Sequence, residues 1–308
     1  MNFVEPSAPI ALRQREWYHL LCMLRSKSPF AMSISDLEKK AYVIRQDIIT
    51  ALARAKSGHS AGPLGMADIF TALYFRILHI TPATKNSPKR DRLVLSNAHI
   101  CPVLYATLAQ RGFAKRADFL QNLRKFGSPF QGHSNSHFDI GIETCGGPLG
   151  QGISQAVGMA LSARMDDATW RTYCLMGDGE LDEGQCWEAI MMAGKERLRN
   201  LTVIIDRNNI QIDGFTEDIM PLEPLADKWR AFLWHVIEID GHNIGQFIDA
   251  VGEAKAVYEK PTVIIAHTIP GKGVRFMENH FEWHGKPPNA EEAKQALAEL
   301  RRIHERST

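Results

Sequence analysis

Two loops in the middle of the chain carry the residues best suited to hold a charged ligand. An apolar run, Thr172 to Met176, leads into Gly177-Asp178-Gly179, and a second run, Leu201 to Ile205, leads into Asp206-Arg207-Asn208-Asn209. A helical stretch separates them, so the pattern predicts strand, loop, helix, strand and loop. Loops that follow neighbouring parallel strands meet at the sheet edge where α/β proteins place their ligands. One carboxylate and one carboxamide oxygen there would suit a hard cation such as Mg²⁺.

The sequence Gly177-Asp178-Gly179 by itself is also typical of an ordinary turn, because glycine and aspartate both favour turns. It belongs with Asn208 to one strand–helix–strand unit, and each of the two follows a strand of that unit, which favours the ligand-site interpretation. The flanking glycines would let a phosphate-bearing ligand approach the backbone closely. We therefore expect a metal and phosphate site at this edge of the sheet.

Four histidines stand in loops that contain or adjoin glycine or follow a predicted strand. They are His59 in a Gly- and Pro-rich segment, His99 after a short apolar run, His133 after a glycine and His284 before one. A lone histidine is more often structural than catalytic, so none of them indicates a function by itself. Imidazole exchanges protons near neutral pH, and a converging set would suit acid–base chemistry.

The most glycine-dense segment, Glu143 to Gly152, precedes a predicted helix from about Ile153 to Met165. A glycine-rich loop at a helix N-terminus offers free N–H groups and a favourable dipole to anions. No Gly-Lys-Ser/Thr follows, which excludes a Walker loop, and the absence of GxGxxG after a strand disfavours a dinucleotide site. The segment is a candidate for holding part of an anionic ligand.

Strand and helix candidates alternate along most of the chain. The expected strands are 92–96, 172–176, 201–205, 233–240 and 261–267, and the expected helices include 35–55, 66–78, 102–111, 153–165, 244–258 and 290–302. This alternation predicts an α/β fold, a doubly wound parallel sheet with helices on both faces. Ser35 to Glu38 has the form of a capping box for the first helix. We expect 1–34 to be an N-terminal extension with a possible helix at 11–24, 35–308 to form one domain, and 211–229 to be loop.

The composition is that of a globular protein without a strong net charge. Among 308 residues, Lys and Arg number 36 and Asp and Glu number 35, so no strong field draws the chain to nucleic acid or to a membrane surface. No stretch approaches the length of a membrane span, and the N-terminus lacks the pattern of a signal peptide. The cysteines form no CxxC pair, which favours reduced thiols and a cytoplasmic location.

Seven segments between about residues 35 and 288 resemble the motifs of one family. They are SGHSAGPLGMADI, SNAHICPVLYATL, GHS, GGPLGQGI, GDGELDEG, DRNNIQIDG and WHG. On these segments the chain resembles the N-terminal, diphosphate-binding domain of transketolases, which bind thiamine diphosphate and Mg²⁺. Seven segments in the same order are far more specific than any one of them.

The resemblance implies a role for each candidate residue. Asp178 and Asn208 would bind Mg²⁺ through side-chain oxygens, and Ile210 would add its backbone carbonyl. The residues implied to contact thiamine diphosphate are His99, Gly147, Leu149, Gly179, Glu183 and Asn208. The residues implied to surround the reacting atoms and substrate hydroxyls are His59, His99, His133 and His284. Glu183 and Glu188 match acidic positions near the contact between two active sites, although a solvated helix surface explains them equally well.

The implied reaction is transfer of a two-carbon ketol unit from a ketose, or a ketose phosphate, to an aldose. The family's later domains carry the glutamate that activates the cofactor and most of the arginines that bind sugar phosphates, and this sequence contains neither domain. We therefore expect a second subunit that supplies the pyrimidine-binding and C-terminal domains. The expected assembly is a heterotetramer, α2β2.

Two other functions stay open from the sequence. A 1-deoxyxylulose-phosphate synthase-like chain or a 2-oxo acid dehydrogenase α subunit would use the same cofactor, but the set of four histidines favours transketolase. A non-catalytic regulatory paralogue is disfavoured because Asp178, Asn208 and all four histidines are present.

Some positions depart from the common pattern of the family. Ile100-Cys101 follow His99 where glycine is more common, and the segment after His133 reads SNSHFDIG. Because this segment is expected near the donor sugar, the substrate is expected to differ from the pentose phosphates of central metabolism. Gly146 stands where full-length enzymes often carry Thr or Pro, which predicts a more flexible loop.

Overall fold

A computed structural model of the chain describes residues 32–307. Its centre is a five-stranded sheet in which all neighbours run parallel, in the order β1-β2-β3-β7-β6. The strands are β1 (Arg92–Leu95), β2 (Thr172–Gly177), β3 (Leu201–Arg207), β6 (His235–Asp240) and β7 (Thr262–His267). The five strands predicted from the sequence are confirmed, with small shifts at their ends.

Burial on both faces explains why the central strands are continuous apolar runs. In β2, Tyr173 and Leu175 join the hydrophobic core on one face of the sheet, while Cys174 and Met176 join the core on the other. Successive side chains of a strand point to opposite faces, so both faces need apolar partners. The whole of β3 is buried for the same reason.

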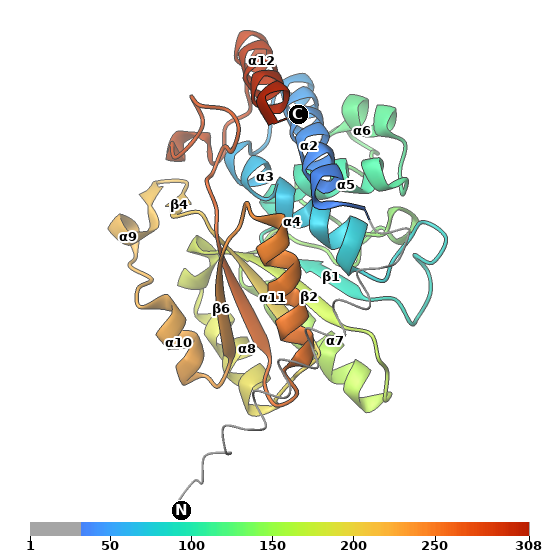
Figure 1. The fold of residues 1–308 in the computed structure, drawn as a ribbon, viewed down its shortest axis with the longest axis vertical. Helices are drawn as coiled ribbons and strands as arrows, with labels where there is room; N and C mark the ends of the chain where they lie inside the picture. Colours follow the sequence, from blue (N-terminus) through green and yellow to red (C-terminus); the bar gives the residue numbers. More distant parts are fainter. Residues whose placement is uncertain (1–31, 308) are drawn as a thin grey trace, which may run out of the picture.

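Helices supply those partners on both faces. The helices are α2 (Ile34–Ala55), α3 (Ala61–Gly65), α4 (Ala67–Ala72), α5 (Cys101–Arg111), α6 (Arg116–Asn122), α7 (Gln151–Met165), α8 (Gly184–Lys195), α9 (Thr216–Ile219), α10 (Leu225–Ala231), α11 (Ile244–Ala256) and α12 (Ala290–Ser307). Short turns of other helical types are η1 (Leu73–Ile77), η2 (Ala98–Ile100), η3 (Phe138–Ile140), η4 (Gly179–Asp182) and η5 (Phe281–Trp283). Residues of α2, α4, α5 and α11 form the core on one face, and residues of α7, α8 and α10 form the core on the other (Figure 1). The predicted doubly wound fold is confirmed.

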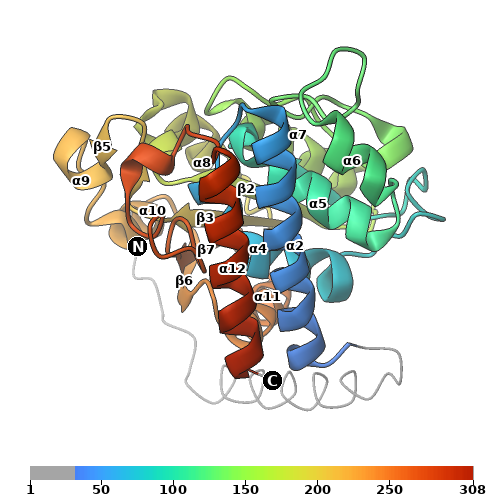
Figure 2. The same ribbon diagram turned by 90° about the horizontal axis from the view of Figure 1, so that it is seen from above.

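The longest helix, α2, begins earlier than its predicted capping box. Ser33, not Ser35, is the N-cap: its hydroxyl accepts a hydrogen bond from the Asp36 backbone N–H at 3.1 Å and donates one to the Asp36 carboxylate at 2.7 Å. Both capping hydrogen bonds therefore join Ser33 and Asp36, in place of the predicted pair of Ser35 and Glu38. At the other end of the chain, α12 packs beside α2 (Figure 2).

Two segments predicted as loops contain short regular elements. One turn of helix, α3, forms in the Gly- and Pro-rich segment 56–65, because Pro63 lies in the first turn, where backbone N–H groups need no helical partner. The segment 211–229 contains most of the hairpin of β4 (Ile210–Gln211) and β5 (Gly214–Phe215), followed by α9 and α10. The helix predicted at 66–78 divides into α4 and the π-helical turn η1.

The predicted N-terminal extension, with its possible helix at 11–24, lies outside the described residues apart from its last few positions. Within 32–307, no helix combines the length and the apolar composition that crossing a membrane requires. The cysteines of that range form no disulfide, and Cys145 is the exposed one among them.

Candidate active site

The carboxyl ends of β1, β2 and β3 border a cavity of about 270 Å³. Its lining includes His59, Asn97, His99, His133, Gly147, Leu149, Asp178, Gly179, Glu180, Asp206, Asn208, Ile210 and His284. Every candidate residue from the sequence except Glu183 and Glu188 lies in this lining. The parallel strands explain the convergence, because they deliver their following loops to one edge of the sheet.

Asp178 is a buried carboxylate whose two oxygens are both held by hydrogen bonds. One oxygen accepts from the Gly179 backbone N–H at 2.8 Å, and the other accepts from the Asn209 N–H at 2.7 Å and from Arg207 Nη1 at 3.1 Å. Burial raises the pKa of Asp178 to about 6, although Arg207 favours the charged form. A carboxylate held in this way can serve as a ligand for a cation in the cavity.

Asn208 is held by the same loop that follows β3. Its side-chain N–H donates to Asp206 Oδ2 at 2.9 Å, and its side-chain oxygen accepts from the Ile210 N–H at 3.1 Å. Between them, Asn209 has a φ of 61°, which turns the chain sharply. The carboxamide therefore has a single orientation in the cavity wall.

Sequence reasoning did not assign a role to Asp206, which also lines the cavity. Its carboxylate accepts from the Thr268 hydroxyl and from Asn208. Burial, and to a smaller extent the nearby Asp178 carboxylate, raises the pKa of Asp206 to about 7. Its position directly before Arg207-Asn208 was visible in the sequence, but its burial was not.

Arg207 is a buried cation that connects Asp178, a candidate metal ligand, to the segment after the β4–β5 hairpin. Besides Asp178, its guanidinium donates to the Thr216 hydroxyl at 2.9 Å, to Glu217 at 2.7 Å and to Glu223 at 3.0 Å. Its side chain is only 3% exposed, against 39% for Glu217 and 58% for Glu223. Three carboxylates thus offset one buried charge, as buried cations require.

Glu180 ties the glycine-rich loop to the loop after β2. One carboxylate oxygen accepts from the Ser96 hydroxyl and from the Gly150 N–H at 2.8 Å, and the other accepts from the Gly177 N–H at 3.1 Å. Burial raises the pKa of Glu180. This residue was also missed from the sequence, where it is one of several acidic residues after Gly179.

The four histidines form a cluster on the other side of the cavity. His59 lies with its ring centroid 5.1 Å from His99, 5.6 Å from His284 and 6.2 Å from His133, and His99 lies 5.0 Å from His284. His59, His133 and His284 come from the loops after α2, α6 and η5, and His99 comes from η2, which follows β1. The close packing of four imidazoles in one cavity permits proton exchange with a bound molecule.

Burial keeps these histidines uncharged near neutral pH. Burial, together with smaller effects of His284, His133 and Arg124, lowers the pKa of His59 to about 4. The same cause lowers the pKa values of His99, His133 and His284. Neutral imidazoles can both donate and accept hydrogen bonds, which suits contacts with hydroxyl groups.

The glycine-rich loop between 143 and 152 is packed tightly against the loop after β1. A Cβ atom on Gly146 would lie 2.1 Å from the Ala98 Cβ and 3.2 Å from the Leu95 carbonyl oxygen. Gly147 has a φ of +142°, a conformation that favours glycine. The expectation that Gly146 makes the loop flexible is therefore wrong: the glycine allows close packing.

Glu183 and Glu188 lie outside the cavity lining. Both are exposed, Glu183 as the N-cap residue of α8 and Glu188 within that helix. The structure thus does not bring Glu183 to the other cofactor candidates, and its role stays a prediction that depends on a partner surface.

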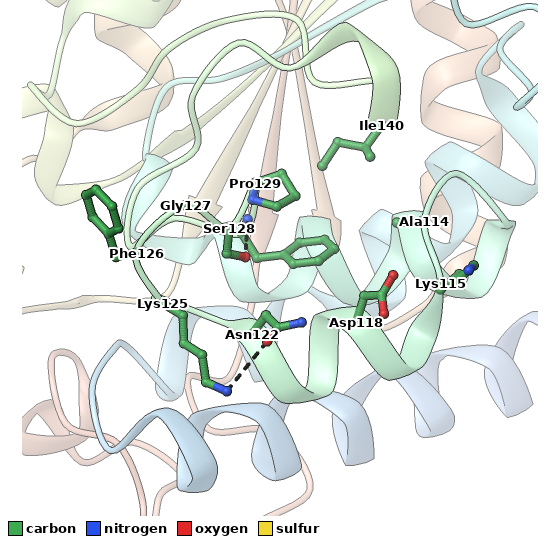
Figure 3. A pocket seen from close by; sticks show the side chains of 11 residues that line it. Ala114, Lys115, Asp118, Asn122, Lys125, Phe126, Gly127, Ser128, Pro129 and Ile140 are labelled. Atoms are coloured by element: carbon green, nitrogen blue, oxygen red, sulfur yellow. Dashed lines mark hydrogen bonds between the residues drawn. The ribbon is translucent and has the colours of Figure 1, made fainter.

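Two larger hollows lie away from this cavity. One, of about 440 Å³, is bordered by residues of α6 and the following loop, where Lys125 contacts Asn122 and Phe126 points away (Figure 3). The other, of about 450 Å³, lies between α2, α12 and the loop that carries His242. Neither contains any of the predicted site residues, so size does not identify the site here.

Across residues 32–307, no three His, Cys, Asp or Glu side chains group as a metal site. The candidate donors are instead one carboxylate, one carboxamide and one backbone carbonyl, from Asp178, Asn208 and Ile210. All are hard oxygen donors in one cavity wall, and this set fits Mg²⁺ that is also bound by phosphate oxygens.

The fold and the cavity define a doubly wound α/β chain with its ligand site at the carboxyl edge of the sheet. Residues 37–302 match the family model described as transketolase, thiamine diphosphate binding domain. The chain therefore belongs to the transketolase family and is of its N-terminal, thiamine diphosphate-binding type.

Known proteins support this assignment along most of the chain. A 6-deoxy-6-sulfo-D-fructose transketolase subunit from Clostridium sp. strain MSTE9 is 45% identical over 265 residues, which cover 86% of this chain and 96% of that protein. A subunit of the apulose-4-phosphate transketolase from Phocaeicola vulgatus is 40% identical over 269 residues, which cover 87% and 95%. The crystal structure of Campylobacter jejuni transketolase matches with a TM-score of 0.80 at 34% identity, covering 87% of this chain and 43% of that chain.

Proposed function

We propose that this chain, with a second subunit, transfers a two-carbon ketol unit from a ketose to an aldose, using thiamine diphosphate and Mg²⁺. The observation that carries the proposal is the convergence of four histidines and three oxygen donors on one cavity. Membership in the transketolase family supports the same reaction.

Residues of this chain would bind the metal and the cofactor on one side of the cavity and the sugar on the other. Asp178, Asn208 and the Ile210 carbonyl would hold Mg²⁺, and Gly147 and Leu149 would contact the cofactor from the glycine-rich loop. When bound, thiamine diphosphate supplies an electron sink for breaking the carbon–carbon bond of the ketose.

The histidine side would bind the sugar and move its protons. His59, His99, His133 and His284 are uncharged near neutral pH, so each can accept a proton from a hydroxyl or donate a hydrogen bond to an oxygen. Their close packing would orient the substrate relative to the cofactor, and orientation of this kind is a large part of enzymatic rate enhancement.

The second subunit would provide the pyrimidine-binding and C-terminal domains, in an α2β2 assembly. Two similar proteins that this chain nearly spans are named as transketolase subunits, which supports a partner chain here. The exposed Glu183 and Glu188 would lie near that contact. Without its partner, the chain should bind thiamine diphosphate poorly and should not turn over substrate.

The substrate would be a ketose with an anionic group, other than the pentose phosphates of central metabolism. The two relatives are named for 6-deoxy-6-sulfo-D-fructose and apulose 4-phosphate, whose sulfo and phosphate groups are anionic. The free cysteines of the described residues favour a cytoplasmic location.

The decisive experiment reconstitutes the pair and measures thiamine diphosphate binding by calorimetry, with and without Mg²⁺. We expect binding that depends on Mg²⁺ and is lost in Asp178→Ala, whereas the exposed control Asp227→Ala binds normally. Ketol transfer is then assayed with sulfonated and phosphorylated ketoses and a series of aldoses. Unchanged binding in Asp178→Ala would contradict the metal assignment, and transketolase activity of the single chain would contradict the need for a partner.

A different thiamine diphosphate reaction is the main alternative. A 1-deoxyxylulose-phosphate synthase-like or 2-oxo acid dehydrogenase-like enzyme would release CO₂ from pyruvate or another 2-oxo acid. Release of CO₂ by the reconstituted pair, without ketol transfer, would favour that alternative. A regulatory paralogue would show neither reaction.

A further inference from the structure

Asn97 is a buried carboxamide in the cavity wall whose side chain has no hydrogen-bond partner within the described residues. It follows β1, lines the cavity and is 0% exposed. Among residues 32–307, neither its side-chain oxygen nor its side-chain nitrogen finds a hydrogen-bond partner. Buried carboxamides are nearly always bonded, so both ends of Asn97 being unpaired calls for an explanation.

Other asparagines of the fold show how unusual this is. Asn208 is bonded through both side-chain ends, Asn200 donates to the Ala160 carbonyl at 2.9 Å, and Asn243 caps α11. A leucine of nearly the same shape would remove the penalty for burying unpaired polar atoms. The unpaired carboxamide is therefore costly unless a bound molecule uses it.

The position of Asn97 indicates which part of a ligand it would meet. A Cβ built on Gly177 would lie 3.8 Å from both the Cβ and the Nδ2 of Asn97, so the amide lies beside the loop that carries Asp178. Two residues further on, His99 lines the same cavity. Asn97 thus lies in the cavity wall next to the loop that carries Asp178.

Its chemistry suits a phosphate group in these surroundings. Asp178, Glu180 and Asp206 line the same cavity, so an added anion needs both a cation and neutral donors to be held there. A carboxamide N–H can donate to a phosphate oxygen, and hydrogen bonds to charged groups are among the stronger ones.

We propose that Asn97 binds the diphosphate of the cofactor through its side-chain carboxamide, as a cofactor-binding residue additional to those implied by the family motifs. This inference rests on the proposed function, because it takes thiamine diphosphate as the ligand of the cavity.

The first test measures the stability of the full chain without ligand. Asn97→Leu removes two unpaired polar groups and keeps the shape of the side chain, so the midpoint of thermal unfolding should rise by about 2 to 4 °C. Asn200→Leu is the matched control: it removes a carboxamide that is bonded, at the opposite end of the sheet, and should lower the midpoint. A lower midpoint for Asn97→Leu would show a structural role and overturn the proposal.

The second test measures binding by calorimetry with two probes. These are inorganic pyrophosphate with Mg²⁺ at millimolar concentration on the full chain, and thiamine diphosphate with Mg²⁺ on the reconstituted pair. Asn97→Leu should weaken both affinities by about 10-fold to 100-fold, which corresponds to the loss of a hydrogen bond to a charged group. Asn97→Asp should weaken them at least as much, because it adds a negative charge, and Asn200→Leu should leave them unchanged.

The outcomes separate this inference from the function on which it rests. Unchanged affinity of Asn97→Leu for both probes overturns the role of Asn97, even when the pair binds thiamine diphosphate normally. A wild-type pair that binds no thiamine diphosphate contradicts the proposed function. In that case the pyrophosphate and unfolding measurements still test whether Asn97 binds a diphosphate group. Weaker binding of both probes together with a higher unfolding midpoint supports the proposal.

Discussion

The two sides of the cavity are built in different ways. On the acidic side, the chain itself supplies partners: Asp178 accepts three hydrogen bonds, and Arg207 donates to three carboxylates and a hydroxyl. On the histidine side, the rings mainly contact one another, and Nδ1 of His59 has no hydrogen-bond partner among the described residues.

The acidic side is therefore preorganised by hydrogen bonds within the chain, whereas the polar groups of the histidine side depend on a bound molecule for their partners. Buried hydrogen bonds fix the carboxylate and carboxamide oxygens before any ligand arrives, and such preorganisation lowers the cost of binding. The histidines instead keep polar groups free for a bound molecule, and beside the Asp178 loop Asn97 does the same. The predictions below test this contrast, from the largest expected effect to the smallest.

The largest loss of stability is expected when the buried cation Arg207 is removed from the acidic side. Arg207→Met leaves Asp178 buried without its charge partner, and breaking a buried ion pair from one side costs about 3 to 5 kcal/mol of stability. Urea unfolding of the full chain measures this loss. The control Arg230→Met breaks an exposed pair with Asp227 and should change stability by less than about 0.5 kcal/mol. An Arg207→Met chain as stable as wild type would show that the acidic side does not depend on this pair.

The contact between Gly146 and Ala98 joins the glycine-rich loop to the loop that carries His99. Gly146→Ala should destabilise the chain by about 1 to 3 kcal/mol, because the added methyl group would overlap that of Ala98. Ala98→Gly in the same chain should restore part of the loss, and the Leu95 carbonyl accounts for the rest. Unfolding of the two single variants and the double variant forms a double-mutant cycle. Strict additivity would argue against a direct contact.

Acid should weaken the fold through the histidine side. Burial lowers the pKa of His59 to about 4 from an ordinary value near 6.5, so the unfolded chain takes up its proton first as the pH falls. The contribution of neutral His59 to stability is therefore complete above about pH 6.5 and is lost towards pH 4. We expect His59→Gln to reduce the acid loss in this window by on the order of 1 kcal/mol.

The buried carboxylates shift stability in the opposite direction over part of the same pH range. Burial raises the pKa values of Asp178 and Asp206 to about 6 and about 7, so protonation favours the folded chain as the pH falls through these values. For this reason, the His59 effect is measured as the difference between wild type and His59→Gln at each pH. A difference that stays constant between pH 6.5 and 4 would contradict the lowered pKa of His59.

The smallest effect is expected at Glu188, on the exposed surface of α8. Glu188→Gln should change the stability of the single chain by less than about 0.5 kcal/mol, because the side chain is solvated. If Glu188 lies at the contact with the second subunit, the same variant should weaken assembly of the pair, measured by analytical ultracentrifugation. Unchanged assembly would leave Glu188 as an ordinary surface residue.

The sequence by itself determined the sheet and the set of loops around the cavity. Apolar runs such as Thr172 to Met176 predicted buried strands because both faces of a parallel strand need apolar side chains. The loop residues followed from their places after those strands, so Asp178, Asn208 and His99 were candidates from their positions along the chain alone. A serine cap for the first long helix was predicted, but at Ser35. Ser33 carries the same hydroxyl group two residues earlier, and the sequence pattern did not distinguish the two.

Only the tertiary structure decided which polar groups have partners and which do not. Glu217 and Glu223 compensate the charge of Arg207, and Gly146 packs against Ala98. The periodic pattern of apolar residues does not predict either contact. Asn97 is one more loop residue in the sequence, and only the structure shows that its carboxamide is buried and has no partner in the described part of the chain. Hydrogen-bond satisfaction and burial depend on segments brought together from across the chain, and sequence patterns report mainly on neighbours along it.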